Sequence, residues 1–238
     1  MIPKVIHYCW FGGNPLPKDV KKCIKSWKKY APDYEIIEWN EYNFDINCHP
    51  FVKTAYEAKA WAFVSDFARL KVIYDNGGIY FDTDVELVKN PDFLLENQCY
   101  IGVQQSGHLC NTGLGFGAVK SSPVLLRMMK QYDNITYSDE IKRKIACPFL
   151  NDEIVKAYRY EPTLEVWSID ELTVFPERFF DPYPSGAGEN LYCNDTVSIH
   201  HYSASWENKK QRFKRKIARL LGEQNVLAIK KFLGKLRG

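Results

Sequence analysis

The sequence predicts an α/β fold, in which strands and helices alternate along the chain and helices cover both faces of one sheet. Three observations support this fold class. Apolar, strand-like segments alternate with amphipathic helical segments from the first residues onward. The 238 residues are 45% hydrophobic and 15% aromatic, which is ample for a buried core. No Ser/Gly/Pro-rich linker, low-complexity run or internal repeat interrupts residues 1–206, so we expect one domain there.

The first half of the chain contains five expected elements. They are strands at residues 4–10, 34–39 and 79–82 and helices at residues 18–30 and 54–74. The buried stripe of the second helix is predicted by four residues at helical spacing, Phe63, Phe67, Leu70 and Tyr74. Asn76 and Gly77 should end this helix, because a residue of either type just past the last turn readily adopts the left-handed conformation.

The second half is expected to continue the same sheet. Its elements are a strand at residues 100–104, a glycine-rich segment at 111–118, a helix beginning at Ser122-Pro123, and short strands at 173–175 and 197–201. In α/β sheets, ligands bind beyond the carboxyl ends of the strands. Residues 10–13 and 82–84 both fall at such ends, so we expect the functional site to include them.

The segment NGGIYFDTDV, residues 76–85, carries two carboxylates out of an apolar strand directly after a glycine turn. If the strand alternation continues through them, Asp82 and Asp84 project from the same face and must share a cation or repel each other. Mg²⁺ and Mn²⁺ accept oxygen ligands from both carboxylates and phosphates. A metal-bound phosphorylated substrate is therefore one interpretation, and a solvated strand end is the other.

Asp66 and Arg69 lie three residues apart on the expected helix 54–74, beside its buried stripe. Residues at this spacing are neighbours on one flank of a helix. They should point toward the same region as the strand end, which would gather four charged groups in one place. An ion pair on a solvated helix face explains the two residues equally simply.

These segments together resemble the core signature of glycosyltransferase family 32, the sugar-binding region that contains a DXD motif. The resemblance rests on SDFAR at residues 65–69 and GGIYFDTD at 77–84, with IPKVIHYCWFGG at 2–13, SW at 26–27 and HHYSASW at 200–206 in register. Relatives include yeast-type initiating mannosyltransferases, bacterial capsular and exopolysaccharide glycosyltransferases and, more distantly, the clostridial glucosylating toxins. The resemblance spans residues 1–206 and implies the type A glycosyltransferase fold, a Rossmann-like α/β/α unit.

The resemblance also implies roles for individual residues. Asp84 should bind the metal directly, while Asp82 should contact sugar or ribose hydroxyls and reach the metal through water. Asp66 and Arg69 should hold the donor sugar, with Arg69 also near the diphosphate. Residues similar to the nucleotide- and sugar-binding positions of the family are Trp10, Gly12, Tyr80, Asp82, Asn111, Ser205 and Trp206.

The closing segment HHYSASW should complete the site. Aligning Trp206 with the closing tryptophan of the family places His201 at the position of a third metal ligand. His200 alternates to the other face of the strand and is expected to be structural. Asn111 and Asp152 follow strand-like segments and are weaker candidates for contact with the sugar or the acceptor.

The activity implied is metal-dependent, retaining transfer of a sugar from a UDP- or GDP-sugar to a saccharide or lipid-linked saccharide acceptor, with Mn²⁺ or Mg²⁺ as cofactor, in bacterial surface polysaccharide biosynthesis. Two alternatives remain open. A strand ending in DxD also resembles the nucleophile motif of haloacid-dehalogenase-like phosphatases. A non-catalytic sugar-binding or membrane scaffold descended from such an enzyme is the other.

The last 32 residues, 207–238, are expected to form a basic amphipathic helical tail. They contain 11 Lys or Arg and 2 Glu, which gives 11 − 2 = +9, against +3 for the whole chain. The tail could bind an anionic membrane or pack on the enzyme's own body. Nucleic acid is disfavoured because no aromatic-stacking module accompanies the charge.

Seven scattered cysteines without a CxxC pair, and the lack of a signal peptide or a spanning apolar run, predict a cytoplasmic protein. Attachment to the inner face of the plasma membrane depends on the tail.

Overall fold

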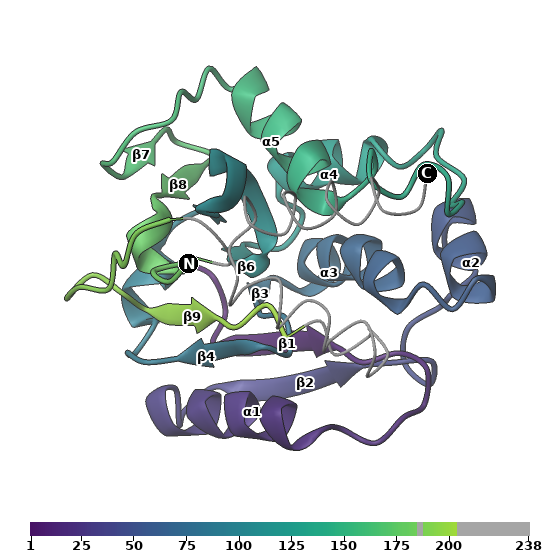
Figure 1. Ribbon diagram of the computed structural model, residues 1–238, viewed down its shortest axis with the longest axis horizontal. Helices are drawn as coiled ribbons and strands as arrows, with labels where there is room; N and C mark the ends of the chain where they lie inside the picture. Colours follow the sequence, from purple (N-terminus) through teal and green to yellow (C-terminus); the bar gives the residue numbers. More distant parts are fainter. Residues whose placement is uncertain (185–187, 204–238) are drawn as a thin grey trace, which may run out of the picture.

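The computed structural model describes residues 1–184 and 188–203. In chain order the elements are β1 (Val5–Cys9), α1 (Lys18–Tyr30), β2 (Glu35–Trp39), α2 (Pro50–Glu57), α3 (Trp61–Asn76), β3 (Gly78–Tyr80), β4 (Val85–Leu87), η1 (Asp92–Glu96), β5 (Cys99–Val103), η2 (Ser106–His108), β6 (Cys110–Ala118), α4 (Pro123–Lys130), α5 (Cys147–Ala157), β7 (Trp167–Ser168), β8 (Thr173–Phe175), η3 (Glu177–Phe179) and β9 (Ser198–His200). Seven strands form one sheet in the order β2-β1-β3-β6-β5-β8-β7, and β4 pairs with β9 in a separate two-stranded sheet (Figure 1).

The large sheet is mixed. β1 is parallel to both β2 and β3, whereas β6 runs antiparallel to β3 and β5. The carboxyl ends of β1 and β3 therefore lie at the same edge, and the first residues of β6 reach that edge from the opposite direction. This arrangement brings three loop or strand segments together at one place.

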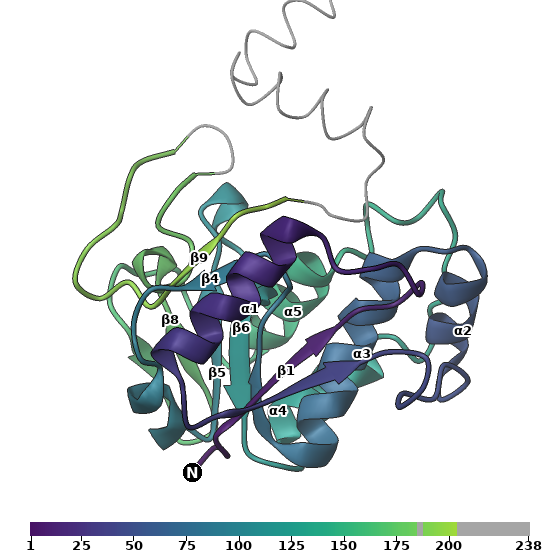
Figure 2. The ribbon, with the colours of Figure 1, turned by 90° about the horizontal axis from the view of Figure 1, so that it is seen from below.

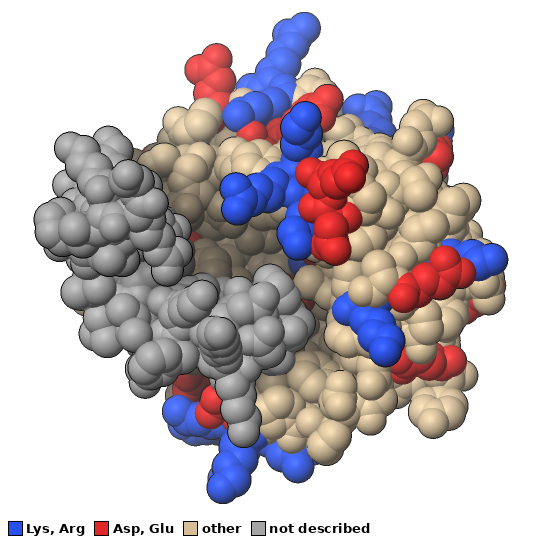
Figure 3. All heavy atoms as spheres, turned by 45° about the vertical axis from the view of Figure 1, so that its right-hand side comes forward, with Lys and Arg blue, Asp and Glu red and all other residues tan. Residues whose placement is uncertain are grey.

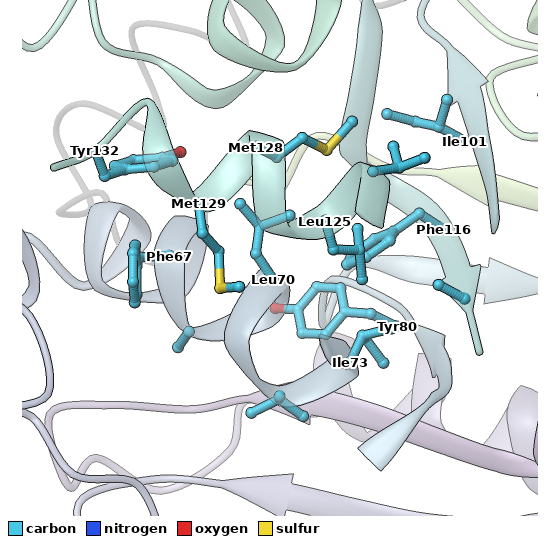
Figure 4. Packing of buried hydrophobic residues seen from close by; sticks show 14 of the residues in the cluster. Phe67, Leu70, Ile73, Tyr80, Ile101, Phe116, Leu125, Met128, Met129 and Tyr132 are labelled. Atoms are coloured by element: carbon cyan, nitrogen blue, oxygen red, sulfur yellow. The ribbon is translucent and has the colours of Figure 1, made fainter. Parts of the chain in front are cut away.

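Helices α3, α4 and α5 pack over one face of the sheet, while α1 and the β4–β9 sheet lie over the other (Figures 1 and 2). The side chains of Ile79, Tyr80 and Phe81 point alternately to the two faces of the sheet. Tyr80 enters the core beneath α3 and α4, whereas Ile79 and Phe81 enter the core beneath α1. Figure 4 shows Leu70 of α3 and Met129 of α4 packed close to the ring of Tyr80. Burial of a side chain of this size stabilises the fold by roughly 1.5–3 kcal/mol.

Strand β6 carries a glycine at every second position of its second half. A Cβ atom at Gly113 would lie 2.6 Å from Asp82 Oδ2, one at Gly115 would lie 2.8 Å from Phe81 Cε1, and one at Gly117 would lie 2.6 Å from Tyr100 Cε1. Each glycine thus lets a neighbouring side chain rest directly on the backbone of β6.

The predicted α/β sheet with helices on both faces is confirmed, but the single helix expected at residues 54–74 is wrong. The chain forms α2 and α3 instead, separated by a turn at residues 58–60. Lys59 adopts φ = 55°, in the left-handed region, which ends α2 and redirects the chain. The sequence offers no glycine or proline at this turn, so its helical periodicity continues through the turn without a visible break. The glycine-rich segment 111–118 is a strand, and α5, β4 and β7 are not indicated by the sequence pattern.

The expected basic tail, residues 207–238, lies outside the described residues, as do Ser205 and Trp206. Among the residues that are described, no helix is both long and apolar enough to cross a membrane.

Candidate functional site

A pocket of about 480 Å³ opens at the carboxyl ends of β1 and β3. Its lining residues come from the end of β1 and the loop after it, from α3, from the turn after β3, from the residue after β5 and the start of β6, from α5 and from the closing segment. They are Cys9, Trp10, Phe11, Asn14, Pro15, Pro17, Trp61, Ala62, Ser65, Arg69, Asp82, Thr83, Asp84, Gln104, Asn111, Pro148, His200 and Tyr202. Figure 3 shows this side of the molecule, where the surface is hollowed.

Asp82 and Asp84 lie in a turn and not in the strand that precedes them. β3 ends at Tyr80, and the amide of Val85 donates to the carbonyl oxygen of Asp82 over 3.0 Å, which closes the turn before β4. Strand alternation is therefore not what brings the carboxylates together. The turn nevertheless places one ligand atom each from Asp82, Asp84 and His200 within 4.8 Å of one another. Two carboxylates and an imidazole at this separation can hold a divalent cation.

The closing segment surrounds the Asp84 carboxylate. His200 Nε2 lies 3.1 Å from Oδ1, and the backbone amide and hydroxyl of Ser203 donate to Oδ2 over 2.8 and 3.1 Å. Burial alone would raise the pKa of Asp84, but His200 and Ser203 together outweigh it and hold this pKa well below its usual range. Asp84 is therefore ionised at neutral pH.

His200, and not His201, lies in the carboxylate cluster, so the prediction for this pair is corrected. β9 pairs with β4 in the register Val85↔His200, which turns the His200 side chain inward with Val85. His201 points to the other face, where its Nε2 lies 2.8 Å from Glu86 Oε2. Asp84 would share that outer face if the strand continued through it. Because the turn swings its carboxylate inward, it contacts His200 instead.

Arg69 forms a buried ion triad with Asp66 and Asp82. Its Nη2 lies 3.0 Å from Asp66 Oδ1 and 3.0 Å from Asp82 Oδ1, and the Arg69 side chain is only 4% exposed. The guanidinium also lies over the ring of Tyr80, whose hydroxyl donates to Asp82 Oδ1 over 3.0 Å. Burial raises the pKa of Asp66 to about 6, although Arg69 acts in the opposite direction. The predicted gathering of these charges is present, and the Asp66–Arg69 pair is not a solvated one.

Several predicted binding residues lie behind the pocket and not on its surface. Tyr80 is buried in the core. Asp66 does not line the pocket but pairs with Arg69, which does. Gly12 supports the pocket wall: its φ is 94°, and a Cβ atom there would lie 2.7 Å from Cε2 of Trp61. Asp152 accepts a hydrogen bond from the Cys110 amide and pairs with Lys156, which is a structural role away from the pocket.

Trp10 and Asn111 do line the pocket. The Trp10 indole donates to the carbonyl oxygen of Asn14 over 2.6 Å, which fixes the ring at the rim. Asn111 Oδ1 accepts from the Gly113 amide over 2.7 Å, and its Nδ2 donates to Gln104 Oε1 over 2.8 Å. Both side chains are thus held in one orientation facing the site.

Four residues that matter most to the site or its support are among those that the sequence interpretation missed. They are Trp61, Gly113, Cys147 and His200. Cys147 contacts both Arg69 Nη1 and Asn111 Oδ1, at 3.7 and 3.5 Å. The glycine alternation at 113, 115 and 117 was the one available signal, because it indicates a strand approached closely by its neighbours.

Comparison with known proteins is consistent with this geometry. Residues 17–101 match the model of the family described as "Glycosyltransferase sugar-binding region containing DXD motif". The matched segment contains the Asp66–Arg69 pair and the Asp82–Asp84 turn. This chain thus carries the sugar-binding DXD region found in glycosyltransferases.

Two curated relatives and one solved structure extend the comparison. The chain is 26% identical over 174 residues to inositol phosphoceramide mannosyltransferase 3 of Schizosaccharomyces pombe, covering 70% of this chain and 48% of that protein. It thus spans about half the length of that relative. An uncharacterized glycosyltransferase of Acanthamoeba polyphaga mimivirus is 24% identical over 229 residues, covering 87% of this chain and 84% of the relative.

The structure of PaToxG glycosyltransferase superposes with a TM-score of 0.53 at 19% identity, covering 66% of this chain and 70% of that one. The fold is therefore that of the type A glycosyltransferases.

Proposed function

We propose that this chain, which carries a sugar-binding DXD region on a type A glycosyltransferase fold, is a metal-dependent, retaining hexosyltransferase. It would move a sugar from a nucleoside diphosphate donor, a UDP- or GDP-sugar, to a saccharide or lipid-linked saccharide in bacterial surface polysaccharide biosynthesis. The observation that carries the proposal is the cluster of Asp82, Asp84 and His200 beside Arg69 in a pocket of about 480 Å³. Pockets of this size hold small-molecule ligands and cofactors.

The donor set fits Mn²⁺, with Mg²⁺ as a less favoured occupant. Two carboxylates suit either ion, but the His200 imidazole favours Mn²⁺, because Mg²⁺ prefers oxygen ligands and water. Asp82, Asp84 and His200 would hold the ion. When bound, a divalent cation stabilises the negative charge that develops on the departing diphosphate.

The protein's own side chains supply binding and orientation. Arg69 is a fixed cation in the pocket wall, and Asp66 holds its guanidinium in place, so this pair would orient the donor sugar or its diphosphate. Trp10 and Trp61 both line the pocket and offer flat rings for the nucleoside base. Asn111 and Gln104 offer amide groups for sugar hydroxyls or for the acceptor.

Retention of the anomeric configuration is supported by the carboxylates that line the pocket. Among the described lining residues these are Asp82 and Asp84, and both belong to the proposed cation site. An inverting enzyme would require a further carboxylate placed to activate the acceptor. A phosphatase nucleophile is a poor role for Asp82, because its Oδ1 is already engaged by Arg69 and Tyr80.

The experiment that tests the proposal is thermal unfolding with a panel of UDP- and GDP-sugars, with Mn²⁺ or with EDTA. We expect at least one donor to stabilise the protein only when Mn²⁺ is present, by about 2.7 kcal/mol at 100 times its dissociation constant. No stabilisation by any nucleotide, together with phosphate release from p-nitrophenyl phosphate, would favour the phosphatase alternative.

Replacement of Gly113 by alanine should impair the site without removing any charged group. The added methyl group would lie 2.6 Å from Asp82 Oδ2 and 3.2 Å from Arg69 Nη1, so the carboxylate has to move. We expect Mn²⁺ affinity and donor turnover to fall by about tenfold or more, since small displacements of positioning groups have effects of this size.

Gly117→Ala is the matched control on the same strand. Its methyl group would lie 2.6 Å from Tyr100 Cε1 and 3.0 Å from the Gly78 carbonyl oxygen, with no carboxylate among the nearest atoms, and should cost about 1–3 kcal/mol of unfolding free energy through overpacking. Its Mn²⁺ affinity, measured by isothermal titration calorimetry, should stay at the wild-type value. Equal loss of affinity in both variants would assign the Gly113 effect to general destabilisation.

We further propose that the enzyme contacts an anionic membrane surface. The basic tail expected for this role lies outside the described residues, but α1 offers independent support. Its six lysines are all exposed: Lys18, Lys21, Lys22, Lys25, Lys28 and Lys29. At 100° per residue they span an arc of about 120° on the helix. The lysine ion pairs of the described chain involve Lys4, Lys71, Lys142 and Lys156, none of them on α1.

The helix also begins beside the pocket, because Pro17, which lines it, directly precedes Lys18. Replacing Lys21, Lys25 and Lys28 by glutamine should therefore weaken binding to vesicles that contain phosphatidylserine. Each lysine near such a surface contributes about 1 kcal/mol, so we expect roughly 100-fold weaker partitioning. A control with Lys53, Lys120 and Lys130 changed to glutamine should bind like the wild type in the same co-sedimentation assay. Identical binding by both triple variants would contradict a role for α1.

A further inference from the structure

The two ring nitrogens of His200 are in different situations. Nε2 lies 3.1 Å from Asp84 Oδ1, whereas Nδ1 is buried and has no hydrogen-bond partner among the described residues. The side chain is only 8% exposed, so solvent does not satisfy Nδ1 from outside. A buried polar atom without a partner costs about 1–3 kcal/mol, which indicates that a further group completes this site in the working enzyme.

Coordination chemistry specifies which kind of group is needed. An ionised carboxylate only accepts hydrogen bonds, so in the metal-free site Nε2 carries the hydrogen that faces Asp84. To bind a cation, Nε2 must instead present its lone pair, and the ring hydrogen then sits on Nδ1. The partner of Nδ1 in the metal-bound state must therefore be an acceptor.

Asp181 supplies an unused acceptor near His200, to which it is linked through the side chain of Tyr202. It is 1% exposed, and its Oδ2 accepts from the Gln105 amide over 2.8 Å and from the Tyr202 hydroxyl over 2.6 Å. Its Oδ1 is buried and has no partner within the described part of the chain. The Tyr202 ring, which links the two residues, lies 4.1 Å from the His200 ring between centroids.

A third unpartnered atom lies on the same face of β9. Ser198 Oγ is also buried and without a partner in the described ranges, and Ser198 precedes His200 by two residues, so both side chains project inward. A buried water typically makes about three hydrogen bonds to such atoms. Ser198, His200 and Asp181 each leave one buried atom available to such a water.

We propose that Asp181 is the positioning residue for the metal-binding histidine, accepting the His200 Nδ1 hydrogen directly or through one buried water. The inference rests on the proposed function, since it assigns a support to the same cation site. Asp181 does not touch the cation or the substrate. It selects the ring tautomer in which Nε2 is free to bind, and it also anchors Tyr202 at the pocket wall.

Asp181→Asn is the informative variant because the amide has the same size as the carboxylate but has only one acceptor oxygen. It cannot accept both from Gln105 and Tyr202 at one atom and from His200 at the other. If its amide nitrogen takes the place of Oδ2, it faces two donors, from Gln105 and Tyr202. If the amide is flipped, the nitrogen faces His200 and favours the tautomer that cannot bind metal. We expect Mn²⁺ affinity, measured by electron paramagnetic resonance of free Mn²⁺, to fall about 10- to 100-fold.

Tyr202→Phe separates positioning of the histidine from anchoring of the closing segment. It removes one donor from Asp181 Oδ2 and leaves Oδ1 unchanged. Mn²⁺ affinity within about threefold of wild type in this variant, with the large loss in Asp181→Asn, would support the proposal. Equal losses in the two variants, or unchanged affinity in Asp181→Asn, would overturn it.

Nitrogen-15 NMR of the Mg²⁺-loaded wild type gives a second test that does not depend on how the variants fold. The His200 signals, assigned with a His200→Ala variant, should show the hydrogen on Nδ1. A hydrogen on Nε2 in the loaded protein would overturn the inference and would remove His200 from the cation site, while Mn²⁺-dependent donor binding would still support the proposed function. A wild type that binds neither Mn²⁺ nor Mg²⁺ would overturn the proposed function along with it.

Discussion

Asp84→Asn should abolish Mn²⁺ binding and reduce sugar transfer by about 10²- to 10³-fold, a loss typical when a group that stabilises developing charge is removed. Asp84 is the carboxylate most strongly held in its ionised form, by His200 and Ser203. The amide retains the shape of the side chain and can still accept from one of these donors. The fold should therefore survive, but the thermal midpoint should fall, because the lowered pKa of Asp84 means that its charge stabilises the folded state.

Glu86→Gln is the matched control for this substitution. Glu86 is the next carboxylate along the chain, two residues away, but it pairs with His201 on the outer face of the β4–β9 sheet. Its loss should leave Mn²⁺ affinity and turnover unchanged. Turnover near the wild-type value in Asp84→Asn, measured as nucleoside diphosphate release from the best donor, would refute the assignment of the cation site.

Arg69→Met should be the most destabilising of these substitutions, at about 3–5 kcal/mol of unfolding free energy. The guanidinium is 4% exposed and is the cation paired with both Asp66 and Asp82. Methionine fills much of the volume but leaves two carboxylates close together without a positive partner. Urea unfolding at pH 8 measures the loss.

The destabilisation by Arg69→Met should also depend on pH. Burial already raises the pKa of Asp66 to about 6 in the wild type, against 3.8 for the unperturbed group. Removing Arg69 raises this pKa further, because Arg69 is the largest of the influences that lower it. A group with a raised folded-state pKa binds its proton more tightly in the native state, so stability is lost as pH rises through that pKa.

The variant should therefore recover part of its stability between pH 8 and pH 5. The double variant Asp66→Asn/Arg69→Met should show a smaller pH dependence. A loss below about 1 kcal/mol at pH 8 would show that the triad is not an electrostatic unit.

The sequence was sufficient for features that depend on local spacing. Asp66 and Arg69 are adjacent on one helix and Asp82 follows a short strand, so the order of helix, glycine turn and strand is enough to predict that they lie together. The strand edge that holds the pocket follows from the same alternation of elements. Helix α1 was predicted with its observed bounds for the same reason.

Features that depend on contacts distant in sequence could not be predicted in this way. The choice between His200 and His201 depends on the register of β9 against β4, more than 100 residues away, and on the turn that swings Asp84 inward. The break between α2 and α3 depends on the left-handed conformation of Lys59, and a lysine gives no indication of that conformation in the sequence. Cys147 reaches Arg69 from α5, a helix that the pattern did not reveal.

The alternating glycines of β6 have a consequence for how this protein can vary. Three positions, 113, 115 and 117, have their side-chain space already occupied by Asp82, Phe81 and Tyr100. In a saturation mutagenesis selected for function, we expect these positions to reject nearly every replacement. Leu114 and Phe116, which point into the two cores between them, should accept other apolar residues. The strand would then show intolerant and permissive positions in alternation. A single-base change that converts one of these glycines to alanine would be removed by selection more often than an exchange between large apolar core residues.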